Sequence, residues 1–181
     1  MKKRQNLLYD KASVKSILIT AALLAAVAGT NFIIYFLKFL PLTGGTAYME
    51  LNIGYLPEDL FAFAESYGTA GRRLYIILSC TLDLLTPFFA SLLFAWIILL
   101  LAEKAGLQRC CTAGFGLCIC VCLSDWAENV CMITVLASYP ARIMAAAVLA
   151  RIFTALKYVL MIIITVLIVY MFMKYRKLTG H

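Results

Sequence analysis

The sequence predicts an all-α integral membrane protein: a four-helix bundle with a short amphipathic interfacial helix in its first outer loop. Two observations support this fold class. The 181 residues are 64% hydrophobic and only 14% charged, far from the composition of an ordinary soluble domain. Four apolar windows each reach the length of about 20 residues that a membrane-spanning helix needs. The remaining tails and loops are too short for a soluble catalytic domain, so residues 1–181 are expected to form a single four-span domain.

The four spans are expected at about residues 15–40, 74–101, 112–137 and 143–173. The first contains Ala26-Val27-Ala28, which has the small residues of a signal-peptidase site, but its apolar stretch continues as far as Leu37. That stretch is too long for the apolar region of a signal peptide. A retained first helix is therefore predicted, with cleavage as the alternative.

The connection between the first two spans predicts one further, shorter helix. Pro57-Glu58-Asp59 supplies a proline suited to the first helical position and acids in the first turn, and Gly68 can end the helix. Apolar residues recur at helical spacing between them. We expect an amphipathic helix on the membrane surface.

The distribution of Lys and Arg predicts the topology. Cytoplasmic segments of membrane proteins carry an excess of these residues. The basic residues cluster in the N-terminal tail, the second loop and the C-terminal tail, at Lys2, Lys3, Arg4, Lys11, Lys15, Lys104, Arg109, Lys174, Arg176 and Lys177, whereas the outer connections offer chiefly Arg72, Arg73 and Arg142. The chain is expected in the cell membrane with both termini cytoplasmic.

Ionisable residues inside the spans mark the candidate site, because a charge within the bilayer is costly unless it faces the bundle interior. At a rise of about 1.5 Å per residue, one polar layer falls roughly 13 to 16 Å below the outer helix ends and a second roughly 20 to 22 Å below them. The first layer contains Asn31, Asp83, Glu128, Asn129 and Arg151, and the second contains Asp125 and Lys157. Asp125, Glu128 and Asn129 share one helix face.

Pro87 adds a backbone feature to the same region. Proline has no N–H, so the carbonyl four residues earlier, that of Asp83, loses its helical partner. A carboxylate beside a free carbonyl is suited to binding a cation or a polar headgroup within a membrane. Arg72 and Arg73 are placed at the outer mouth of the site, where they either attract an anionic group or anchor the helix at the interface.

The leading hypothesis is a polar pocket in the outer half of the bundle that binds a lipid headgroup or a small polar or charged molecule, for transport or lipid processing. The alternative is an accessory or assembly subunit whose charges form structural ion pairs, Asp125 with Lys157 and Glu128 or Asp83 with Arg151. Enzymatic activity is left open, and catalytic residues are not assigned. Besides the bilayer and the ligand, a second copy or a membrane protein is considered as a partner. Nucleic acid, a cofactor and a metal are not expected.

The seven cysteines do not predict a disulfide framework. Most lie in the cytoplasmic half of the third span, where thiols stay reduced, and no CxxC pair occurs. Cys80 and Cys131 lie in the outer half, and whether they pair is left open.

Overall fold

A computed structural model describes residues 13–49 and 54–179, and within them it contains helices and no strand. Four of the helical segments are long and apolar enough to cross a membrane, namely Val14–Leu42, Gly68–Lys104, Cys110–Ser138 and Met144–Thr179. The basic residues Lys2, Lys3, Arg4 and Lys11, on which part of the predicted topology rests, lie outside the described residues.

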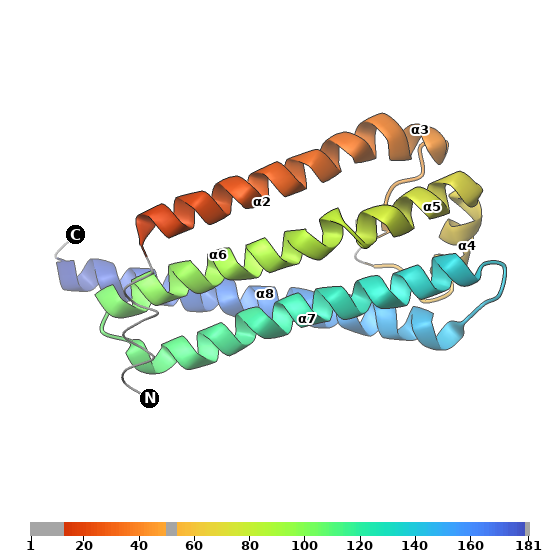
Figure 1. The fold of residues 1–181 in the computed structure, drawn as a ribbon. Helices are drawn as coiled ribbons and strands as arrows, with labels where there is room; N and C mark the ends of the chain where they lie inside the picture. Colours follow the sequence, from red (N-terminus) through yellow and green to blue (C-terminus); the bar gives the residue numbers. More distant parts are fainter. Residues whose placement is uncertain (1–12, 50–53, 180–181) are drawn as a thin grey trace.

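The elements follow in the order shown in Figure 1. The first elements of the described residues are α2 (Val14–Ile34), the π-helical turn η1 (Tyr35–Phe39) and α3 (Leu40–Leu42). Two shorter helices, α4 (Asp59–Ser66) and α5 (Gly68–Ser79), precede α6 (Leu82–Lys104). The last two helices are α7 (Gln108–Ser138) and α8 (Met144–Thr179).

The long helices alternate in direction, and α7 packs against both α6 and α8. One part of this three-helix core is an apolar cluster that includes Ile98 of α6, Val121 of α7 and Ile164 of α8. By contrast, α2 lies alongside α6 at the edge of the bundle, and many of its apolar side chains, such as Leu18, are exposed. Because lipid is as apolar as these side chains, such exposure is expected of a helix in a membrane.

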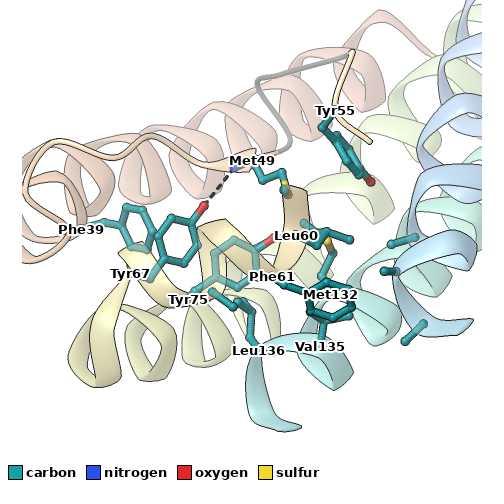
Figure 2. Close-up of a cluster of buried hydrophobic side chains, with 14 of the residues drawn as sticks. Phe39, Met49, Tyr55, Leu60, Phe61, Tyr67, Tyr75, Met132, Val135 and Leu136 are labelled. Atoms are coloured by element: carbon teal, nitrogen blue, oxygen red, sulfur yellow. Dashed lines mark hydrogen bonds between the residues drawn. The ribbon is translucent and has the colours of Figure 1, made fainter. Parts of the chain in front are cut away.

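An aromatic cluster fills the end of the bundle at which α3 and α4 lie (Figures 1 and 2). The Phe39 ring packs edge-on against Tyr67, with the centroids 5.0 Å apart. The Tyr67 hydroxyl accepts a hydrogen bond from the Met49 N–H at 3.0 Å and donates one to the carbonyl of Ala47 at 3.0 Å. A Cβ atom at Gly71 would lie 2.8 Å from Thr43 Cγ2, so a glycine is needed for this close approach.

The helix expected after Pro57 is present as α4. Its apolar residues Leu60, Phe61 and Ala64 are buried, and they belong to the same cluster as Met132 and other residues of α7 (Figure 2). This apolar face is therefore covered by the protein itself. The location of α4 at a membrane surface stays a prediction.

The second apolar segment, predicted as one span at about residues 74–101, is interrupted. Helix α5 begins at Gly68 and ends at Ser79, and α6 begins at Leu82. Thr81, between them, has φ −123° and ψ −86°, outside the helical region. The break places Asp83 in the first turn of α6 instead of the middle of a continuous helix. A carboxylate is favoured there, because a helix N-terminus carries unpaired N–H groups and a partial positive charge.

Candidate functional site

Lys157 of α8 is the centre of a buried charge cluster. Its Nζ lies 2.7 Å from Asp125 Oδ1 and 2.5 Å from Glu128 Oε2. The Glu128 side chain is only 1% exposed, and those of Lys157 and Asp125 are 13% and 19% exposed. The two acids are three residues apart on α7 and so share the face that meets α8. One lysine thus pairs with two carboxylates in surroundings where an unpaired charge is costly.

A chain of hydrogen bonds links this cluster to the first outer connection. Thr154 Oγ1 lies 2.8 Å from Glu128 Oε1 and 2.9 Å from the Tyr55 hydroxyl. A carboxylate only accepts, so Thr154 donates to Glu128, sharing its proton with the Ala150 carbonyl at 2.9 Å. Tyr55 then donates to Thr154. Tyr55 is 1% exposed, and Figure 2 shows it reaching from the connection that precedes α4.

Asp83 is held by the helices on either side of α6. Asn31 Nδ2 of α2 donates to Asp83 Oδ1 at 2.5 Å. Asn129 Nδ2 of α7 lies 3.5 Å from the backbone oxygen of Asp83, the carbonyl that loses its helical partner to Pro87. This carbonyl therefore faces a side-chain amide and is not left open to a ligand. The carboxylate keeps Oδ2 without a hydrogen bond among residues 13–49 and 54–179.

A cavity of about 290 Å³ lies between α6, α7 and α8, beside these polar groups. Its polar wall consists of Asp83, Asp125, Asn129 and Lys157, with the Thr86 hydroxyl nearby. The rest of the lining is mainly apolar and comes from Pro87, Ala90, Phe94, Val121, Tyr158 and Met161. Glu128 is not among the lining residues and lies behind Lys157. The cavity combines a few charged groups with apolar walls, as ligand pockets commonly do.

A second cavity of about 330 Å³ lies between α2 and α6. Asn31 and Thr86 line it together with aromatic side chains, namely Phe32, Tyr35, Phe36 and Tyr48. Thr86 also lines the first cavity, so the two cavities adjoin at the Asn31–Asp83 hydrogen bond. Tyr35 begins the π-helical turn η1, and such turns often occur at functional sites.

The three arginines proposed for the site do not line either cavity. The Arg151 guanidinium lies 5.5 Å from the centre of the Tyr55 ring and forms no ion pair within the described part of the chain. Arg72 donates to the Ala64 carbonyl at 2.7 Å and stacks over the Tyr139 ring at 4.3 Å, so it joins α4 and α5 to the end of α7. Arg73 is exposed. Of the two ion pairs considered from the sequence, the Asp125–Lys157 pair is present, and Lys157 takes the place of Arg151 beside Glu128.

Two features of the site could not be read from the sequence. Tyr55 lies in a loop, and no local pattern connects it with a residue of the last helix. The aromatic wall around Tyr35 and Tyr48 depends on how the loop folds back on α2. Thr154, by contrast, precedes Lys157 by three residues on the same helix face, and this spacing is a sequence signal for its place in the site.

The cysteines take no part in bridges. No disulfide joins any of the seven, Cys80 and Cys131 included.

Comparison with protein families, with curated proteins and with solved structures found no match for this chain.

Proposed function

We propose that this chain is a multi-pass membrane protein that binds a lipid headgroup or a small polar or charged molecule in the cavity between α6, α7 and α8, for transport or lipid processing. One observation carries the proposal. A cavity of about 290 Å³ with Asp83, Asp125 and Lys157 in its wall lies within helices apolar enough to span a membrane. Charged groups at such positions are rare unless they serve a pathway or a ligand.

The depth of the cavity supports binding at the level of the outer headgroups. Along α6, Asp83 lies about 32 Å from Lys104, and along α8, Lys157 lies about 26 Å from Lys174, at about 1.5 Å per residue. The hydrocarbon core is about 30 Å thick. With Lys104 and Lys174 at the cytoplasmic boundary and both termini cytoplasmic, Lys157 would lie inside the hydrocarbon core and Asp83 would reach its opposite boundary, where lipid headgroups begin.

The positions of the two acids support different roles in this proposal. Glu128 is enclosed between Lys157 and Thr154 and does not line the cavity. Asp83 lines the cavity, and its Oδ2 has no hydrogen bond within the described residues. We therefore assign Asp83 to the ligand and Glu128 to holding Lys157 in position. In an accessory subunit whose charges are only structural, both acids would instead contribute to the stability of the fold.

A cavity-filling substitution tests the proposal without removing a charge. Ala90→Phe places a ring in the cavity, whereas Ala155→Phe adds the same ring at an exposed position of α8. The protein is incorporated in nanodiscs of phosphatidylethanolamine and phosphatidylglycerol, then released and weighed by native mass spectrometry. We expect the wild type and Ala155→Phe to retain a non-covalent adduct of defined mass, and Ala90→Phe to lose it.

A second variant covers the case in which Ala90→Phe does not fold. Asp83→Asn keeps the shape of the side chain, and we expect loss of the adduct with little change in melting temperature. The proposal is wrong if the wild type retains no adduct, or if the folded variants retain it at wild-type occupancy. A large loss of stability in Asp83→Asn would favour the accessory-subunit alternative.

A further inference from the structure

The hydrogen-bond inventory of the cavity shows more acceptors than donors. Asp83 and Asp125 each use Oδ1, toward Asn31 and Lys157 respectively, and each keeps Oδ2 without a hydrogen bond in residues 13–49 and 54–179. The buried Oδ1 of Asn31 has no partner either. Lys157 Nζ lies 2.7 Å from Asp125 Oδ1 and 2.5 Å from Glu128 Oε2, so its charge is directed to these two acids. Asp83 Oδ2, Asp125 Oδ2 and Asn31 Oδ1 therefore remain as three acceptor atoms without a donor in the described part of the chain.

The charges show the same imbalance. Asp83, Asp125 and Glu128 contribute three carboxylates. In the described part of the chain, Lys157 is the one cation within 4.0 Å of Asp125 and Glu128, and no cation lies that close to Asp83. Arg151 does not restore the balance, because its guanidinium lies over the Tyr55 ring. The cluster thus has an excess of negative charge, which favours a cation over an anion.

The walls of the two adjoining cavities fit a cation that carries an apolar chain. Phe94 and Tyr158 line the charged cavity, and the Lys157 ammonium already lies 5.7 Å from the centre of the Tyr158 ring, a distance suited to a cation–π contact. Beyond the Asn31–Asp83 hydrogen bond, the cavity of about 330 Å³ is lined mostly by aromatic side chains. An amphiphile can place its charged group between the carboxylates and its chain along these rings or in the lipid.

We propose that the ligand of this site is a primary ammonium group carried by an amphiphile, with Asp83 Oδ2 and Asp125 Oδ2 as its main acceptors and Asn31 Oδ1 as a further one. This inference rests on the proposed function, since it names the chemistry of the group that the cavity binds. A primary ammonium supplies three N–H donors to three open acceptors, whereas a quaternary ammonium supplies charge without donors. The same ammonium chemistry is found in an aminophospholipid headgroup and in a free long-chain amine.

Two sets of probes identify the group and its source. In the first, nanodiscs contain phosphatidylethanolamine, phosphatidylcholine or phosphatidylglycerol with identical acyl chains, and adducts are counted by native mass spectrometry. In the second, dodecylamine, dodecyltrimethylammonium and dodecanoate are added to phosphatidylcholine nanodiscs. We expect the primary amine of either set to exceed its methylated counterpart by about tenfold, the effect of one charge-assisted hydrogen bond. Retention of the phospholipid indicates a headgroup ligand, and retention of dodecylamine alone indicates a free amine.

Asp83→Asn is expected to lower amine occupancy by about tenfold or more for the same reason. Glu103→Gln is the matched control, because it removes an exposed carboxylate at the other end of α6 and should bind as the wild type does. The inference is overturned if phosphatidylglycerol, dodecanoate or the methylated probes are retained as well as the amines, or if folded Asp83→Asn binds amines undiminished.

The failure of this inference can be told apart from failure of the proposed function. A non-amine adduct that Ala90→Phe abolishes would contradict the amine and leave the binding pocket in place. The absence of any adduct in the wild type would contradict both.

Discussion

Replacing Lys157 with methionine should destabilise the protein more than replacing any arginine of the outer half. Methionine keeps much of the apolar stem and removes the ammonium that lies 2.7 Å from Asp125 and 2.5 Å from Glu128. Removing one partner of a buried ion pair costs about 3–5 kcal/mol. Because the Glu128 side chain is 1% exposed, it cannot recover hydration, and we expect a loss of about 3–5 kcal/mol in the free energy of unfolding.

The matched control is Arg151→Met, six residues earlier on the same helix. Its guanidinium lies 5.5 Å from the Tyr55 ring centre, and a cation–π contact is worth about 0.5–2 kcal/mol. The two substitutions remove one cation each from α8. The difference between their losses in the free energy of unfolding measures the contribution of the contacts between Lys157 and the two carboxylates.

The assay is reversible unfolding by dodecyl sulfate in mixed micelles, followed by circular dichroism. A double variant, Lys157→Met with Glu128→Gln, also removes the buried charge of Glu128 and should recover at least about 1 kcal/mol of the free energy of unfolding. The reasoning is refuted if Arg151→Met costs as much as Lys157→Met, or if the double variant is no more stable than Lys157→Met alone.

Two further substitutions test the structure with controls from the same chain. Thr154→Val removes the hydroxyl that joins the buried carboxylate to the outer connection, and the free energy of unfolding should fall by about 1.5–3 kcal/mol. Thr165→Val removes an exposed hydroxyl that donates to the Met161 carbonyl of its own helix, and it should cost well under that in the same unfolding assay. Gly71→Ala introduces a Cβ 2.8 Å from Thr43 Cγ2 and should lower stability by about 1–3 kcal/mol. A Cβ at Gly29 meets nothing within 4 Å, so Gly29→Ala should be neutral or stabilising in a thermal melt. Equal destabilisation by both alanines would contradict the close approach of Gly71 to Thr43.

Much of the fold could be predicted from the sequence because it depends on local properties. Apolar length predicts the long helices, which the structure contains, and helical spacing places Asp125 and Glu128 on one face, where both contact Lys157. The interruption before Asp83 was not predicted, because Cys80 and Thr81 are compatible with a continuous helix and Pro87 was the expected source of irregularity.

For the candidate site, the sequence could predict only the depth of each residue along its helix axis. A rise of about 1.5 Å per residue gives the depth of each charge, but not the rotation of one helix against another. Arg151 shares the predicted depth of Glu128, yet its guanidinium lies at Tyr55. Lys157 comes from the deeper layer and reaches Glu128 because its long stem is flexible.

The sequence by itself determined that this chain has four long apolar helices and which of them carry charges, because length, composition and periodicity are properties of single segments. Only the tertiary structure decided which charges meet. It paired Lys157 with both acids of α7, set Asn31 against Asp83, and brought Tyr55 from a loop to Thr154. These contacts depend on helix rotation and on the path of a loop, and both are results of packing between segments distant in the chain.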